Sequence, residues 1–198
     1  ILIMNTLHQL DLLLLKTING WHTPWADLLM WQVSGTLIWI PLYAFFLYVL
    51  IKAFKKQSFV ILIGVILLIT STDQTTNLIK HSKARLRPSH QQELSQELHY
   101  VNEYRGGKYS FPSGHAANTM GIALFLTLLL GRQYSSLRWI PIPWSLFVGF
   151  SRVYLGVHFP SDVLAGFLLG ALWGYIWYRL ILFALSRLSK EKTEAQHE

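Results

Sequence analysis

The sequence SGTLIWIPLYAFFLYVLI, residues 34–51, contains no charged side chain. An apolar run of about 18 residues is long enough to cross the hydrocarbon layer of a bilayer as one helix. Four more apolar blocks follow, at residues 58–79, 116–131, 139–157 and 163–185, each bounded by charged or turn-forming residues. Because these blocks have helical lengths and strongly apolar compositions, the sequence predicts five membrane-spanning helices.

The overall composition also favours a membrane protein. Hydrophobic residues make up 52% of the 198 residues and charged residues 14%, whereas a soluble domain carries about 25% charged residues. The alternative, a soluble helical bundle with unusually apolar helices, fits this composition less well. We therefore expect an all-α fold, a multi-span membrane helical bundle of five to six transmembrane helices.

The chain divides into three regions. In residues 1–33, Leu7, Leu10 and Leu14 recur at helical spacing, which suits an amphipathic helix lying in the membrane interface. A sixth span is the alternative, but Asp11 lies near the middle of this segment and a charge in hydrocarbon is costly. Residues 34–187 form the predicted transmembrane domain, and residues 188–198 form a polar cytoplasmic tail.

Charge indicates the partners and the orientation. The net charge of +7 favours anionic partners, which for a membrane protein are membrane lipids and phosphates rather than nucleic acid. Basic loop residues mark the cytoplasmic side, and eight of them follow spans one, three and five: Lys52, Lys55, Lys56, Arg132, Arg138, Arg187, Lys190 and Lys192. The opposite loop, residues 80–108, carries six basic residues. The orientation is therefore supported only if several of these six serve in the chemistry of the site.

Three short blocks concentrate the polar chemistry, and all fall at span ends on the same side of the predicted membrane. The first is KHSKARLRP, residues 80–88, which places Lys80, Arg85 and Arg87 at the end of span two. Such cations suit a multiply charged anion, because a guanidinium can hold phosphate oxygens bidentately. The alternative is a basic juxtamembrane patch that attracts lipid head groups.

The second block is Pro112, Ser113, Gly114 and His115, directly before span three. A serine before an apolar run is a good helix N-cap, and a glycine lets the backbone approach a ligand. The free amides of the first helical turn can then face an anion beside the histidine. The alternative is a helix cap that contains a histidine by chance.

The third block joins spans four and five and contains Ser151, Arg152, His158 and Asp162. A histidine and a carboxylate four residues apart across a Pro-Ser turn can meet, so that the carboxylate fixes the imidazole tautomer. A structural hydrogen bond and half of a metal site are the alternatives. The metal site is the weaker one, because neighbouring cations would repel a metal ion and no cysteine is available.

In order, the blocks match KxxxxxxRP, PSGH and SRxxxxxHxxxD. This pattern resembles the type 2 phosphatidic acid phosphatase family, which shares its active site with the vanadium haloperoxidases. The resemblance covers residues 34–187 and implies a catalytic domain with the helical fold of that superfamily. It also implies that the phosphate is held by Lys80, Arg87, Ser113, Gly114 and Arg152, with Arg85 and Pro112 as supporting residues.

The same resemblance implies a reaction without metal or cofactor. His158 attacks phosphorus to form a phosphohistidine, Asp162 orients it, and His115 protonates the leaving alkoxide. The substrate is then a lipid phosphate, met on the extracytoplasmic face of the inner membrane. Short loops favour a bacterial source, hence undecaprenyl pyrophosphate or phosphatidylglycerol phosphate, with phosphatidic acid and lipid A phosphate also compatible. A non-catalytic lipid-phosphate binder or transporter and a vanadate-dependent haloperoxidase are the alternatives.

Asp73 lies inside the predicted second span. A carboxylate in a membrane span is by default a candidate functional residue. Asp73 precedes Lys80 by seven residues, about two helical turns, so the two share a helix face. We expect Asp73 to have a structural role, either orienting Lys80 or bracing the bundle, rather than a direct part in catalysis.

Overall fold

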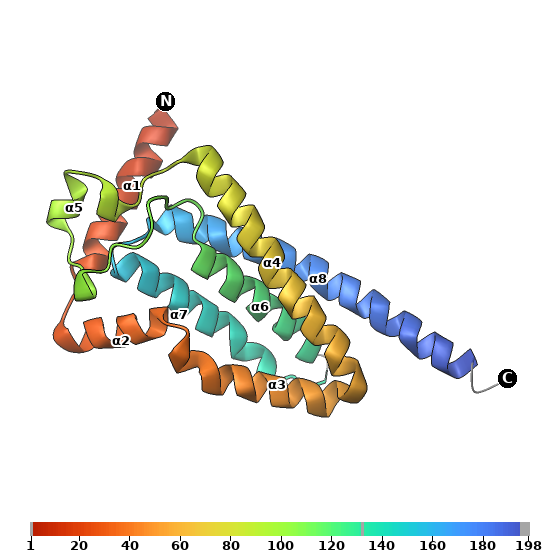
Figure 1. The fold of residues 1–198 in the computed structure, drawn as a ribbon. Helices are drawn as coiled ribbons and strands as arrows, with labels where there is room; N and C mark the ends of the chain where they lie inside the picture. The colour runs from red at the N-terminus through yellow and green to blue at the C-terminus, as the bar shows by residue number, and fades with distance from the viewer. Residues whose placement is uncertain (1, 132, 195–198) are drawn as a thin grey trace.

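The computed structural model describes residues 2–131 and 133–194, and its elements are helices joined by turns and loops (Figure 1). The described residues contain no strand, and Leu86 and Tyr109 form an isolated β-bridge. The prediction of an all-α fold is confirmed. The α-helices are α1 (Leu2–Asn19), α2 (Pro24–Ser34), α3 (Ile40–Phe54), α4 (Ser58–Lys83), α5 (Leu94–Glu97), α6 (Gly114–Leu130), α7 (Pro141–Tyr154) and α8 (Pro160–Glu194).

Helix α6 is the centre of the bundle and packs against α4, α7 and α8 (Figure 1). Its contact with α8 is unusually close, because Gly166, Gly170 and Gly174 recur every four residues along α8 and face the α6 backbone. A Cβ atom on Gly166 would lie 2.5 Å from the Ser113 carbonyl oxygen. Small residues at this spacing let membrane helices approach closely. The contact brings the N-terminus of α6 beside the N-terminus of α8.

The outer faces of the helices are apolar, as expected in a bilayer. Along α8, Leu164, Leu168 and Leu172 recur every four residues and are largely exposed. Two helical stretches are long and apolar enough to cross a membrane: Leu37–Lys83, which contains α3 and α4, and Pro160–Ser189; α6 is apolar but shorter. These features are those of a membrane protein, but the expected five to six spans are not confirmed.

The first predicted span begins later than residue 34. Helix α2 continues to Ser34, Gly35 caps its C-terminus, and α3 starts only at Ile40. Pro41 occupies the first turn of α3, a position proline tolerates because the amide it lacks would have no intrahelical partner there. The fifteen residues of α3 extend over about 22 Å. This is less than the roughly 30 Å of a hydrocarbon layer.

The N-terminal helix α1 packs against α7 and α8. Its Leu15 is fully buried in a cluster with Phe159 and Leu98, and its Asp11 is 7% exposed. The first 33 residues therefore contribute to the interior of the molecule. Whether α1 lies in the membrane interface, and whether a boundary falls at residue 33, stay predictions.

The basic loops and the three polar blocks lie at opposite ends of the bundle. The turn from α3 to α4, the connection from α6 to α7 and the C-terminal part of α8 gather at one end, while residues 84–113 lie at the other (Figure 1). This arrangement fits the distribution of basic residues used for the orientation. Helix α8 continues through the predicted tail to Glu194, and Arg132 and residues 195–198 lie outside the described part of the chain.

Candidate active site

His158 and Asp162 face each other where α7 turns into α8. His158 Nδ1 lies 3.5 Å from Asp162 Oδ2, and the two side chains are 1% and 0% exposed. The Phe159 amide donates to the same carboxylate oxygen at 2.9 Å. His158 Nδ1 has no hydrogen-bond partner within the described residues. The turn thus places the buried His158 imidazole beside the Asp162 carboxylate, which the Phe159 amide holds in position.

Arg85 holds the other side of that carboxylate. Its Nη1 donates to Asp162 Oδ1 at 2.8 Å and its Nη2 donates to Asp11 Oδ2 at 2.8 Å. Asp11 also accepts from the Ser161 amide at 2.8 Å. We had expected Arg85 to join Lys80 at an anion site, but two carboxylates already share its charge. Arg85 therefore supports Asp162 from behind.

Sequence reasoning missed Asp11, because its burial became visible only in the structure. Asp11 and Leu15 are four residues apart and so share one face of α1. Leu15 is fully buried and Asp11 nearly so. A carboxylate on the buried face of a helix requires a cationic or hydrogen-bonding partner. The partner, Arg85, is 74 positions away in the chain, and no sequence pattern links the two.

Arg87 and Lys80 line one large pocket. Arg87 donates to the carbonyl oxygens of Tyr109 at 3.2 Å and Val157 at 3.4 Å. Burial and the charge of Arg152 lower the pKa of Arg87 to about 10, so its guanidinium stays charged at neutral pH. The Lys80 Nζ atom lies 3.5 Å from the position that a Cβ on Gly114 would occupy. The first and second blocks therefore meet in space.

Arg152 lies deeper, 2% exposed. Its Nη1 donates to Ser34 Oγ and its Nη2 donates to the Tyr104 hydroxyl at 3.2 Å, while its Nε is buried without a partner in the described residues. Together with His115 it lines a second pocket of about 430 Å³. Ser34 and Tyr104 lie outside the three blocks, and no sequence signal had marked them.

The N-terminus of α6 lies against the start of α8. Ser113 caps α6, its Oγ accepting from the Ala116 amide at 3.5 Å, as the sequence predicted. The Ser113 amide donates to the Asp162 carbonyl oxygen at 2.9 Å. Pro112 precedes it through a cis peptide bond. His115, on the first turn of α6, lines both pockets.

The electrostatics of His158 follow from this arrangement. Burial lowers the pKa of His158 well below its ordinary value of 6.5, and the positive charges of Arg87, Arg152 and Lys80 lower it further. Its imidazole is therefore neutral at neutral pH and keeps a free lone pair. The same three cations, gathered around a neutral ring, would be stabilised by an anion with several negatively charged oxygens.

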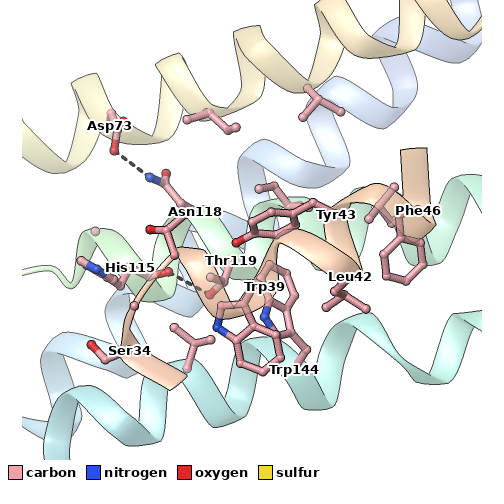
Figure 2. Close-up of a pocket in the computed structure, with 18 of the residues that line it drawn as sticks. Ser34, Trp39, Leu42, Tyr43, Phe46, Asp73, His115, Asn118, Thr119 and Trp144 are labelled. Carbon is pink, nitrogen blue, oxygen red and sulfur yellow. Dashed lines mark hydrogen bonds between the residues drawn. The ribbon is translucent and has the colours of Figure 1, made fainter. Parts of the chain in front are cut away.

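The larger pocket extends from His115 toward Phe46 in the apolar part of the bundle (Figure 2). Its volume is about 690 Å³, and its lining combines Lys80, Arg87 and His115 with apolar side chains such as Phe46 and Leu126. Helices α3, α4, α6 and α7 supply its walls. A cavity of this shape accommodates a molecule with a charged head and an apolar remainder.

Asp73 also lines this pocket. Its Oδ1 accepts from Asn118 Nδ2 at 2.8 Å, which joins α4 to α6 (Figure 2). In the described residues no ion pair joins Asp73 to Lys80. Of the two structural roles expected for Asp73, bracing the bundle therefore has a direct contact behind it, whereas orienting Lys80 has none.

Comparison with known proteins places the chain in a family. The family model described as the PAP2 superfamily matches residues 57–185, more than half of the sequence. The chain belongs to the PAP2 superfamily. All three polar blocks fall inside the matched range, whereas Asp11 and Ser34 lie before it. The resemblance found from the motifs to the type 2 phosphatases is confirmed.

Individual PAP2 relatives match most of the chain. The lipid A 4'-phosphatase of Bacteroides thetaiotaomicron is 36% identical over 93% of this chain and 83% of its own length. The crystal structure of Aquifex aeolicus LpxE has a TM-score of 0.67 at 26% identity, covering 86% of this chain and 95% of its own. A transmembrane PAP2 type phosphatidylglycerolphosphate phosphatase from Bacillus subtilis has the same fold, with a TM-score of 0.68 at 23% identity over 89% and 86% of the two chains.

Proposed function

We propose that this PAP2 protein is a membrane lipid phosphatase that hydrolyses a phosphate ester through a phosphohistidine intermediate. The observation that carries this proposal is the buried His158 beside Asp162, with the positive charges of Lys80, Arg87 and Arg152 acting on it. A protein that only binds or transports a lipid phosphate needs the cations but gains nothing from such a pair. The comparisons likewise favour the phosphatase over a haloperoxidase.

In the first step, the Nε2 lone pair of His158 attacks phosphorus in line with the ester oxygen. The N–P bond forms as the P–O bond breaks, and His115 gives a proton to the departing alkoxide. Burial and the nearby cations lower the pKa of His115 to about 3, so the ring takes up this proton when the bound phosphate offsets those cations. Asp162 Oδ2, 3.5 Å from Nδ1, stabilises the positive charge that develops on the ring. The lipid alcohol leaves and His158 carries the phosphoryl group.

In the second step, water attacks the phosphohistidine. His115 takes the proton from that water, the N–P bond breaks, and inorganic phosphate is released. In both steps Lys80, Arg87 and Arg152 neutralise the equatorial phosphate oxygens, and the amides at the start of α6 add donors. The described residues contain no group of three or more His, Asp or Glu side chains arranged to hold a metal ion, and none of these steps assigns a role to one.

We further propose a phosphorylated glycolipid of the lipid A 4'-phosphate type as the first candidate substrate. The relative that matches nearly the whole chain is named for that reaction. Undecaprenyl pyrophosphate and phosphatidylglycerol phosphate, favoured from the sequence, follow it. The distribution of basic loops supports an enzyme of the inner membrane whose site faces the periplasm.

Phosphate release from purified protein in detergent tests this function. We expect activity in the presence of EDTA on at least one of lipid A 4'-phosphate, undecaprenyl pyrophosphate, phosphatidylglycerol phosphate and phosphatidic acid. The specificity constants then rank the four. Stoichiometric lipid binding without phosphate release from any of them would overturn the proposal in favour of a lipid-phosphate binder.

A further inference from the structure

We propose that Asp73 and Asn118 form a polar subsite that accepts hydrogen bonds from a hydroxyl or amide N–H on the organic group that carries the phosphate. The pocket would then select glycolipid or polyol phosphates over a phosphate whose neighbouring groups have no donors. This inference rests on the proposed function. It assigns Asp73 to substrate selection in addition to its contact with α6.

The first support is the position of Asp73 relative to the anion site. Both Lys80 Nζ and Thr76 Oγ1 lie within 4 Å of the position of a Cβ on Gly114, at 3.5 and 3.9 Å. The lysine side chain therefore leans back to the level of Thr76, as helical side chains do. Asp73 lies one turn below Thr76, a step of about 5 Å. A group two or three bonds beyond the ester oxygen spans that step.

The second support is the fixed geometry of the carboxylate. Asn118 Nδ2 donates to Asp73 Oδ1 at 2.8 Å, while Asn118 Oδ1 accepts from Thr72 Oγ1. The amide of Asn118 is thus oriented by a hydroxyl on α4. Asp73 Oδ2 has no hydrogen-bond partner among the described residues. A carboxylate oxygen accepts hydrogen bonds, so this oxygen, on a residue that lines the pocket, can accept from a donor on the ligand.

The third support is that Asp73 opens on the cavity, whereas the donor on the opposite wall does not. Trp144 on α7 is 6% exposed, and its Nε1 is buried without a partner in the described residues. Figure 2 shows Asp73 and Trp144 on opposite sides of the cavity that both line. The Trp144 N–H is closed off from the cavity beneath the rings of Trp39 and Tyr43, so Asp73 is the polar group that the cavity presents between these two walls. A hydroxyl or amide N–H on the ligand satisfies the free oxygen of Asp73, whereas a hydrocarbon chain would leave it unpaired at a cost in affinity.

Asp73 could instead serve only to brace α4 against α6, and the two roles predict different substrate dependence. A brace affects every substrate equally, because it acts on the protein. A subsite affects only substrates that carry the donor. Phosphatidylglycerol phosphate has a free hydroxyl next to the phosphorylated carbon, and phosphatidic acid with the same acyl chains has none, so these two lipids form a matched pair.

The experiment compares kcat/KM on this pair for the wild type, Asp73→Asn and the control Gln74→Ala, whose side chain is exposed on the same helix. We expect Asp73→Asn to lower kcat/KM on phosphatidylglycerol phosphate about tenfold, because a charge-assisted hydrogen bond becomes a neutral one. Its kcat/KM on phosphatidic acid should stay within about twofold of wild type, as should both values for Gln74→Ala. An equal loss on both lipids, or no loss on either, would overturn the subsite.

Binding separates this inference from the proposed function. Titrating the two lipids into the protein in nanodiscs, followed by tryptophan fluorescence, requires no turnover. With His158→Ala as the background, so that the lipids stay intact, we expect phosphatidylglycerol phosphate to bind more tightly than phosphatidic acid, and the added change Asp73→Asn to remove that preference. If the wild type hydrolyses neither lipid but this preference is found, the phosphatase proposal fails and the subsite stands. If the wild type hydrolyses both lipids but this binding preference is absent, the subsite fails and the phosphatase proposal stands.

Discussion

Replacing Gly166 with alanine tests whether the close contact between α6 and α8 sets the geometry of the site. The new Cβ would lie 2.5 Å from the Ser113 carbonyl oxygen and 2.9 Å from Ala116 Cβ, whereas ordinary contact begins at 3.4 Å. The difference, 3.4 − 2.5 = 0.9 Å, must be taken up by moving the helices apart. The clashing atom of Ser113 is its backbone carbonyl oxygen, so a change of side-chain rotamer cannot relieve this clash.

Two opposing effects determine the loss of stability. Alanine is a better helix former than glycine by about 1 kcal/mol, and overpacking costs about 1–3 kcal/mol. The net loss is therefore small, roughly 0–2 kcal/mol. The effect on catalysis is larger, because a displacement of about 1 Å between reacting groups can cost about 100-fold in rate. Gly166 lies one turn from Asp162, and Ser113 lies two residues from His115. Moving the helices apart therefore moves Asp162 away from His115.

The assay is phosphate release by purified Gly166→Ala, together with its thermal unfolding in the same detergent. We expect kcat to fall by about 10- to 100-fold with a melting temperature close to wild type. Gly107→Ala is the matched control, because nothing lies within 4 Å of a Cβ added there. Wild-type kcat in Gly166→Ala would refute the argument that this helix contact positions the active site.

Four further predictions concern the site itself. His158→Ala should abolish the labelled phosphoenzyme and lower kcat at least about 10³-fold. The control His90→Ala, at an exposed histidine, should have little effect. A phosphoenzyme that still forms in His158→Ala would exclude His158 as the nucleophile. Because burial and the charge of Arg87 lower the pKa of His158 below 6.5, nitrogen NMR should find its ring neutral at pH 6.5, and Arg87→Gln should raise that pKa. The unfolded chain takes up this proton first, so the stability due to His158 is fully present above pH 6.5 and declines as the pH falls toward the folded-state pKa; a ring already half protonated at pH 6.5 would contradict this. Asp11→Asn should lower kcat about tenfold with KM unchanged, as when a residue that orients a catalytic group is lost, with the exposed Gln9→Ala as control; an unchanged kcat would show that Asp11 does not act through Asp162. Dialysis against EDTA should leave kcat unaltered, and activity restored only by an added divalent ion would require a metal in the mechanism.

The fold class was predictable because hydropathy is a local property. Each of the five apolar blocks became a helix, since a stretch such as residues 58–79 excludes charge over several turns whatever surrounds it. The start of α3 was predicted six residues too early, because Gly35 and Pro41 outweighed the continuous hydrophobicity of the segment. The number of spans was not predictable in the same way, because helices as short as α7 need the rest of the bundle to reach across a bilayer.

The residues of the candidate site likewise fall into those that the sequence predicted and those that it did not. The residues named from the motifs follow a fixed order and spacing, and the turn between α7 and α8 brings His158 to Asp162 over only four positions. Asp11, Ser34 and Tyr104 joined the site through contacts across 48 to 118 positions. Such contacts depend on how complete helices pack, and neither residue type nor spacing indicates them.

By itself, the sequence determined that this chain is helical and apolar, because hydropathy depends on short stretches. It also predicted which histidines, cations and carboxylate serve a phosphate, because those residues follow a fixed motif. Only the tertiary structure decided that Arg85 turns away from the pocket toward two carboxylates, and that Asp73 lines the pocket opposite a buried indole. The reason is that a charged side chain settles where a partner satisfies it, and that partner is found only after distant helices have packed.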